Sequence, residues 1–261
     1  EYTRQFLTSL YSYQYYGLPY YNGSGDFPEA NNPYVGKCEV LSDCWHANWS
    51  GSAMYNRYYS GSHTAGYGRL ADKWHYITNR VWQAVRAGWL LIENVDGVPG
   101  LSNEEKLSIK AEAKCIIAAR YFDTFRHYGG IPIIKASFSG TDASYDMPRG
   151  SVEETVNFMV GLLDEAAASL PWNVDESEAS NEEGHWTKAA AMALKCRILL
   201  FAASPLFNDT EPYHTDGTNN PAVWYGAYKP ELWEQCWQAC DDFFKELQAK
   251  GYYELTQATE A

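Results

Sequence analysis

The chain has 261 residues, of which 46% are hydrophobic, and this is enough to bury the core of one large domain or of two small ones. Its formal net charge of −13 opposes binding to nucleic acid, because an acidic surface repels the phosphates. No stretch approaches the ~18 consecutive apolar residues that span a bilayer, and the first residues show no signal-peptide pattern, so any membrane attachment is expected to come from outside this sequence.

The first part of the chain, residues 1–69, is predicted to be a short helix followed by a long irregular region. Residues 17 to 69 are rich in Gly, Asn, Ser, Tyr and Trp and show no sustained hydrophobic periodicity. The densest cluster of aromatic and polar residues lies here and consists of Trp45, Asn48, Trp49, Tyr55, Tyr58 and Tyr59, with Asn56 and Arg57 between them.

This cluster has the composition of a carbohydrate-binding site and is the candidate binding site of the chain. Sugars present C–H faces that stack on aromatic rings, and hydroxyl groups that need hydrogen-bond partners, so a site for a glycan combines both residue types. The alternative is that these aromatic residues fix the long loop against the helices, because Trp and Tyr are usually largely buried.

The second part, residues 70–261, is predicted to consist of helices joined by loops. A helix over roughly 70 to 94 carries one apolar stripe, at steps of three and four residues, formed by Leu70, Trp74, Ile77, Val81 and Val85. The next helix begins at the capping box of Ser102 and Glu105. It ends at Gly129 and Gly130, where glycine tolerates a positive φ. We expect these two helices to pair antiparallel.

Three more helices are predicted downstream. Ser151 and Glu154 repeat the capping box, and the helix that they open ends at Pro171. An Ala-rich helix follows from Thr187 to Pro205. The last helix runs from Pro230 to Gly251. We expect its stripe to be buried, and the stripe consists of Trp233, Trp237, Cys240, Phe244 and Leu247. A partner helix is expected to follow it.

The spacing of these helices predicts the fold class. Helices that begin near residues 70, 151 and 231 are about 80 residues apart, and each is the first member of a pair. This spacing indicates helical hairpins stacked as a solenoid, and therefore an all-α protein. The core expected on these patterns includes Leu163 in the third helix and Leu200 in the Ala-rich helix.

The six cysteines do not form the disulfide framework of a small secreted protein, because the chain is too long for that class. Cys115 and Cys196 lie among apolar residues at helical spacing and are expected to be core thiols. Cys236 and Cys240 share one helix face, which suits either packing or two metal ligands, but no further ligand lies at a zinc-motif spacing. We therefore predict no metal and no cofactor. Two alternatives stay open: a disulfide bridge between Cys38 and Cys44, and a calcium ion in the loop near residues 209–220.

Catalytic residues are not predicted. A glycosidase needs two carboxylates that face each other across a cleft, but the acidic pairs Glu153-Glu154, Asp164-Glu165 and Asp241-Asp242 lie beside apolar helix stripes, as solvated residues do. Nucleophile, metalloprotease and phosphate-loop motifs are missing from the sequence. The prediction is a protein that is not an enzyme.

Three stretches resemble the SusD/RagB family in their residue patterns and in their order along the chain. They are Glu112 to Ile134 (EAKCIIAARYFDTFRHYGGIPII), Arg149 to Pro171 (RGSVEETVNFMVGLLDEAAASLP) and Thr187 to Asn208 (TKAAAMALKCRILLFAASPLFN). The resemblance implies tetratricopeptide-like helical hairpins, stacked as a solenoid with long irregular loop insertions. It also implies that the family's C-terminal half follows Ala261 in a complete member, so that residues 70–261 are part of a single domain.

The resemblance implies a function as well. A family member is a lipoprotein on the outer membrane that binds a glycan at the cell surface and delivers it to a SusC-like TonB-dependent transporter, with its lipid anchor outside this sequence. The D-C-W-x-x-N-W pattern from Asp43 to Trp49 is where the family's early aromatic contacts would fall. Two alternatives stay open: a helical-repeat scaffold, which would bind peptides and ignore sugars, and an all-α glycoside hydrolase, which would turn a polysaccharide over.

Overall fold

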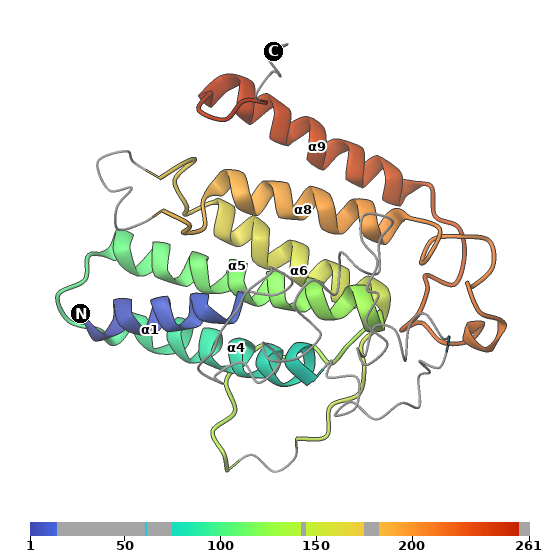
Figure 1. The fold of residues 1–261 in the computed structure, drawn as a ribbon, viewed down its shortest axis with the longest axis horizontal. Helices are drawn as coiled ribbons and strands as arrows, with labels where there is room; N and C mark the ends of the chain where they lie inside the picture. Colours follow the sequence, from blue (N-terminus) through green and yellow to red (C-terminus); the bar gives the residue numbers. More distant parts are fainter. Residues whose placement is uncertain (15–60, 62–74, 142–144, 175–182, 256–261) are drawn as a thin grey trace. The chain divides into compact units, whose positions relative to one another are not determined.

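The structure is a computed structural model that describes residues 1–14, 61, 75–141, 145–174 and 183–255. The chain forms two compact units, one of Glu1–Leu10 with Val81–Ala261 and the other of Tyr11–Arg80. The first unit contains most of the described helices (Figure 1). The division of the chain into two parts at residue 70 stays a prediction. The predicted glycan-binding cluster at residues 45–59 lies outside the described residues.

Every regular element in the described part of the chain is a helix, which confirms the all-α prediction. The short helices are α1 (Tyr2–Tyr11) and three 3-10 turns, Ser12–Gln14, Val95–Gly97 and Thr215–Gly217. The long helices are α4 (His75–Asn94), α5 (Asn103–Tyr128), α6 (Val152–Ala167), α8 (Lys188–Ala203) and α9 (Glu231–Lys250). None of these helices is both long enough and apolar enough to cross a membrane.

The predicted capping boxes set the starts of α5 and α6. The Ser102 hydroxyl accepts from the Glu105 backbone N–H, and the Glu105 carboxylate accepts from the Ser102 N–H at 2.8 Å. Ser151 and Glu154 form the same pair of bonds. Because these bonds satisfy backbone groups that a helix start leaves free, each box fixes where its helix begins. They also lower the pKa of both glutamates, since the backbone N–H groups favour the charged carboxylate.

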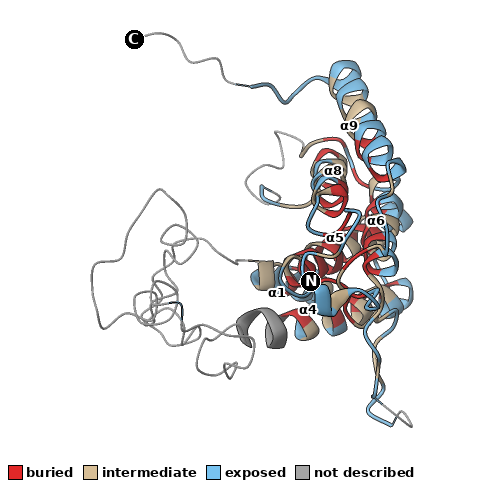
Figure 2. Ribbon diagram, turned by 90° about the vertical axis from the view of Figure 1, so that its right-hand side faces the viewer, coloured by how far each residue is buried: buried red, intermediate tan, exposed pale blue. Residues whose placement is uncertain are grey.

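The helices from α5 onward form a stack in which each packs on the next: α5 on α6, α6 on α8, and α8 on α9 (Figure 1). The middle of α5 is buried on all sides, because residues 115–118 are enclosed by its neighbours (Figure 2). On the side of α4, a Cβ on Gly88 would come within 2.8 Å of the Ile117 side chain, so glycine allows the two helices to approach closely. On the side of α8, Phe122 and Phe125 make edge contacts with Phe201.

The prediction that Leu163 belongs to the core is confirmed, since it is buried in α6 together with Val152, Val156, Met159 and Ala166. Two other core predictions are wrong. Leu200 in α8 is 53% exposed, because α8 turns the neighbouring Ile198 and Leu199 inward instead. In α9 the buried side is formed by Leu232, Cys236 and Ala239, whereas Trp233, Trp237 and Phe244 of the predicted stripe are exposed and its other two residues, Cys240 and Leu247, are half-buried.

The cysteines of the described helices are free thiols, as predicted for packing residues. Burial raises the pKa of Cys196 to about 12 and that of Cys236 to about 11, and Cys240 adds to both effects. Burial also raises the pKa of Cys115. These groups are therefore protonated at neutral pH, in the state that suits an apolar interior.

Candidate functional site

A pocket of about 390 Å³ lies where the C-terminal end of α5 meets the loops on either side of the turn Thr215–Gly217. We call it the α5-end pocket. Its lining comes from residues 126–129 of α5, from residues 206–207 after α8, and from residues 212–223 before α9. Its volume falls within the range of ~300–1,000 Å³ that is usual for small-ligand sites.

Two glycines hold the end of α5 against the loop before α9. Gly129 has a φ of +71°, and a Cβ there would come within 2.3 Å of the Ala222 carbonyl oxygen. The Gly130 N–H donates to that same carbonyl at 2.7 Å, and a Cβ on Gly130 would meet the Gly150 carbonyl oxygen at 2.1 Å. Only glycine fits at either position, so the predicted end of the helix is also a tight junction between three segments.

Arg149 completes this junction. Its Nε donates to the Gly130 carbonyl at 2.8 Å, and one terminal nitrogen donates to the carbonyls of Tyr128 and Ala222. The planar guanidinium offers several donors in fixed directions, which suits a side chain that must satisfy three carbonyls at once. Next to it, the Val152 N–H donates to the Pro221 carbonyl at 2.8 Å, so the start of α6 is tied to the same loop.

The segment that follows α8 forms the floor of the pocket. The Phe207 ring stacks on Phe125 of α5, with ring centroids 4.8 Å apart. Its neighbour Asn208 is buried, donates to the Lys229 carbonyl at 3.0 Å and accepts from the Lys229 N–H at 2.7 Å. The Asn208 side chain thereby supplies hydrogen-bond partners to the backbone N–H and carbonyl of Lys229, which lies in the loop before α9. Buried polar groups are almost always hydrogen-bonded in this way. The first and third of the stretches that carry the family resemblance thus contribute to this pocket, and Arg149 of the second is bonded to the adjoining junction.

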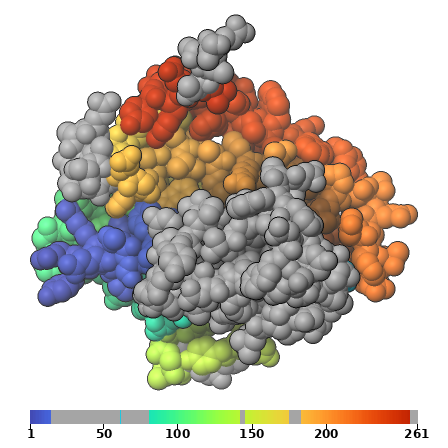
Figure 3. Space-filling model, in the orientation of Figure 1, coloured from blue at the N-terminus to red at the C-terminus, as the bar shows by residue number. Residues whose placement is uncertain are grey.

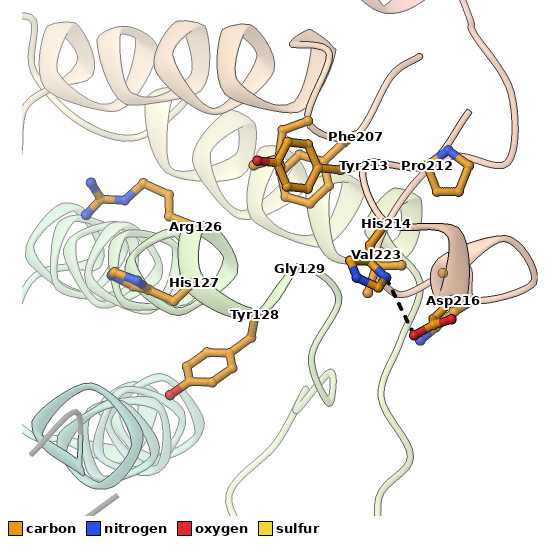
Figure 4. A pocket seen from close by; sticks show the side chains of 13 residues that line it. Arg126, His127, Tyr128, Gly129, Phe207, Pro212, Tyr213, His214, Asp216 and Val223 are labelled. Carbon is orange, nitrogen blue, oxygen red and sulfur yellow. Dashed lines mark ion pairs between the residues drawn. The ribbon is translucent and has the colours of Figure 1, made fainter. Parts of the chain in front are cut away.

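The walls of the pocket present aromatic rings beside polar groups (Figure 4). Tyr128 projects from the end of α5 and is 42% exposed, while Tyr213, in the loop before α9, is 85% exposed. In that loop the His214 Nδ1 lies 3.6 Å from the Asp216 Oδ2. Exposed tyrosine rings offer faces to the C–H groups of a sugar, and the imidazole and carboxylate offer donors and acceptors to its hydroxyls.

The charged groups of the pocket do not favour an anionic ligand. Arg126 is engaged elsewhere, because it donates to the Asp123 carboxylate at 2.7 Å and lies over the Phe122 ring at 5.1 Å from the centroid. His214 has a carboxylate beside it. Because both of these basic side chains lie beside a carboxylate, a neutral ligand with many hydroxyl groups fits the pocket better than a phosphate or a carboxylate does.

Among the described residues, those that line the pocket do not form the paired carboxylates of a glycosidase. Asp216 is the one carboxylate among the residues that line it, whereas that chemistry needs two carboxyl groups across the scissile bond. Among the described residues there is also no group of three or more His, Cys, Asp or Glu side chains that could hold a metal ion. The geometry therefore suits binding of a ligand.

The sequence pattern did not identify the residues of this pocket as a site. Tyr128 was predicted only as part of a helix end, and Tyr213 lies in a loop whose composition resembles that of other loops. The family stretches supply part of the lining, since Tyr128 lies in the first and Phe207 in the third, but Tyr213 lies outside all three and no sequence signal marks it. The predicted cluster of Trp45, Asn48, Trp49, Tyr55, Tyr58 and Tyr59 stays a prediction, because it lies outside the described residues.

Comparison with known proteins shows what this chain is similar to. Residues 22–200 match the model of a SusD-like family that is described as starch-binding and associating with the outer membrane. No curated protein matches the sequence.

Several solved structures share the fold. The protein BT4246 is 24% identical, with a TM-score of 0.70 over 97% of this chain and 40% of its own. A SusD-like carbohydrate binding protein from Bacteroides vulgatus ATCC 8482 is 16% identical, with a TM-score of 0.60 over 98% of this chain and 46% of its own. A SusD homolog from Bacteroides thetaiotaomicron VPI-5482 is 13% identical, with a TM-score of 0.59 over 97% of this chain and 41% of its own. The chain therefore spans less than half the length of the structures that it matches.

Proposed function

This chain belongs to the SusD-like family, and on that premise we propose that it binds a polysaccharide or oligosaccharide at the bacterial cell surface without cleaving it. The glycan is then delivered to a SusC-like TonB-dependent transporter of the outer membrane for nutrient uptake. The protein is held at the membrane by a lipid anchor that lies outside this sequence. The family's description as starch-binding and associating with the outer membrane supports glycan binding and a location at that membrane.

The observation that carries the proposal is the chemistry of the α5-end pocket. Tyr128 and Tyr213 expose ring faces, and His214, Asp216 and Asn220 supply polar groups beside them. This combination recognises a neutral sugar through stacking on its C–H face and hydrogen bonds to its hydroxyls. A site for a peptide helix would instead present a longer apolar groove.

A second set of glycan contacts is proposed in the first part of the chain. Trp45 and Trp49 lie in the D-C-W-x-x-N-W pattern, with Tyr55, Tyr58 and Tyr59 shortly after it. These residues fall inside the range that matches the family, whereas Tyr213 lies beyond it. The proposal is that the early cluster supplies the contacts common to the family and that the α5-end pocket adds contacts particular to this protein.

Native affinity electrophoresis tests the proposal. The protein is run through gels that contain one polysaccharide each, from a panel of plant, microbial and host polymers, and the same mixtures are assayed for released oligosaccharides. We expect at least one polymer to retard the protein and no product to form. Release of oligosaccharide would show an enzyme, and free migration through every polymer in the panel would contradict glycan capture.

Matched variants separate the two proposed sets of contacts. Tyr213→Ala removes an 85% exposed ring from the α5-end pocket, and Tyr2→Ala removes an 86% exposed ring from α1, far outside that pocket. We expect Tyr213→Ala to weaken retardation and Tyr2→Ala to leave it unchanged. Trp45→Ala and Trp49→Ala test the early cluster in the same gels, with the melting temperature recorded to exclude unfolding.

A further inference from the structure

Three cysteine side chains gather where α8 packs on α9, and we call them the thiol cluster. Cys196 lies in α8, and Cys236 and Cys240 lie about one turn apart in α9. The two helices are neighbours in the stack, and Figure 3 shows the atoms of α9, in red, directly above the orange atoms of α8. All three side chains are free thiols, and the proposed glycan site does not use them.

The register between the two helices places Cys196 opposite the cysteines of α9. The Lys188 ammonium, at the start of α8, lies 3.0 Å from the Glu246 carboxylate, in the last turns of α9. The helices therefore run in opposite directions (Figure 1), and a step forward along α8 matches an equal step backward along α9. Cys196 is eight residues after Lys188. The position eight residues before Glu246 lies midway between Cys236 and Cys240.

A cleft of about 290 Å³ between α6, α8 and α9 agrees with this register. Lys195 of α8 and Ala239 of α9 both line it. Each is seven residues from the member of the ion pair on its own helix, so the cleft and the ion pair give the same alignment. These two residues are also the chain neighbours of Cys196 and Cys240. The cleft therefore opens beside the thiol cluster, where a small reagent can enter.

Cys240 is the nearer partner of Cys196. Burial is the largest cause of the raised pKa of Cys196, and the next is a hydrogen bond with Cys240, whereas Cys236 acts on it through charge alone. A hydrogen bond acts only at short range, so the sulfurs of Cys196 and Cys240 are close together. Both side chains are half-buried, while Cys236 is 5% exposed. The pair that is closest is therefore also the pair that solvent can reach.

We propose that Cys196 and Cys240 are a site of disulfide formation, at which an oxidising disulfide reagent or enzyme covalently joins α8 to α9. The Cys240 thiolate attacks the incoming disulfide, forms a mixed disulfide and releases one thiol of the oxidant. The Cys196 thiolate then attacks the Cys240 sulfur, which forms the bond between the helices and releases the second thiol. The two cysteines lose two protons and two electrons, and the oxidant is reduced to its two thiols.

The bond encloses the segment that contributes most of the α5-end pocket. Cys196 and Cys240 are 44 positions apart, and residues 206–207 and 212–223 of the pocket lie between them. A cross-link stabilises a protein mainly by restricting its unfolded chain, and the effect grows with the length of the closed loop. Oxidation therefore stabilises α9 and the loops before it. This inference concerns a covalent bond and does not depend on glycan binding.

Peptide mapping after oxidation tests the proposal. The folded protein is incubated with oxidised glutathione at pH 8 until its products no longer change, then acidified, digested with pepsin and analysed by mass spectrometry. We expect the peptides of Cys196 and Cys240 to be linked in most molecules, while Cys115, which is fully buried in α5, stays a thiol. The proposal is overturned if Cys196 and Cys240 stay thiols, if Cys196 links to Cys236, or if Cys240 keeps glutathione without passing the bond to Cys196.

Two serine variants of α9 provide an independent readout. Cys240→Ser removes a member of the proposed pair, and Cys236→Ser removes the neighbouring thiol and serves as the matched control. Each variant is melted in its reduced form, which shows that it folds, and again after oxidation. We expect oxidation to raise the melting temperature of Cys236→Ser by about 5–10 °C more than that of Cys240→Ser. Equal shifts in the two variants would contradict the proposal.

Discussion

Replacing Gly130 by alanine tests the junction that builds the α5-end pocket. The new Cβ would lie 2.1 Å from the Gly150 carbonyl oxygen, whereas a carbon and an oxygen ordinarily stay about 3.3 Å apart even in a C–H···O contact. The two segments must therefore separate by roughly 1 Å. That movement disrupts the bonds from the Gly130 N–H to Ala222 at 2.7 Å and from Arg149 to the Gly130 carbonyl at 2.8 Å.

The expected cost follows from these contacts. Two lost hydrogen bonds contribute about 0.5–1.5 kcal/mol each, and the overpacking contributes about 1–3 kcal/mol. We expect the free energy of unfolding to fall by about 3 kcal/mol, which corresponds to a drop in melting temperature of about 6–12 °C for a chain of this size. Urea denaturation followed by circular dichroism measures the first quantity, and calorimetry measures the second.

The control is Gly161→Ala in the middle of α6, where a new Cβ meets no atom within 4 Å. Because alanine restricts the unfolded chain and favours a helix, this variant should be more stable than the wild type by about 0.4–1 kcal/mol. The two alanine substitutions are chemically identical and should act in opposite directions. A Gly130→Ala protein as stable as the Gly161→Ala protein would refute the tight junction.

Two further predictions concern the core. Leu163→Ala should destabilise the protein by about 2–5 kcal/mol because that side chain is buried, while Leu200→Ala, on the exposed side of α8, should change stability by less than about 0.5 kcal/mol in the same urea titration. At pH 8 the raised pKa of Cys196 and Cys236, about 12 and about 11, keeps both as thiols, so iodoacetamide should alkylate them at least about a hundredfold more slowly in the folded protein than in guanidinium. Equal rates in the two states would contradict their burial.

Local signals in the sequence predicted the helix boundaries well. A capping box such as Ser151 with Glu154 needs only residues that are three positions apart, so its geometry is encoded in a short window. The end of α5 at Gly129 was predicted for the same reason, because a positive φ at a helix end selects glycine. These features depend little on which other helices are nearby.

Which side of a helix faces the core was harder to predict. In α9 large apolar residues occupy both the buried and the exposed side, so periodicity alone could not show that Leu232 is buried and that Trp237 is exposed. In α8 apolar residues surround the helix, and nothing in their spacing distinguishes the exposed Leu200 from the buried Leu199. Packing partners decide both cases, and the sequence does not specify them locally.

The candidate site was the least predictable part. Tyr128 and Tyr213 lie in different segments, and they are brought to one pocket by the long-range bonds of Arg149 and Gly130 to Ala222. No periodic pattern records such an arrangement. Family resemblance identified the segments that frame the pocket, but the exposed rings that would touch a ligand became visible only in the structure.

The measurement that tests the central claim most directly is calorimetric titration of a soluble oligosaccharide, cut from the polymer that retards the protein most, into wild type, Tyr213→Ala and Tyr2→Ala. Stacking of a ring on a sugar face is worth about 1 kcal/mol or more, so Tyr213→Ala should raise Kd at least about fivefold, while Tyr2→Ala should leave Kd unchanged. If the wild type binds and Tyr213→Ala binds equally well, the α5-end pocket is not a glycan site.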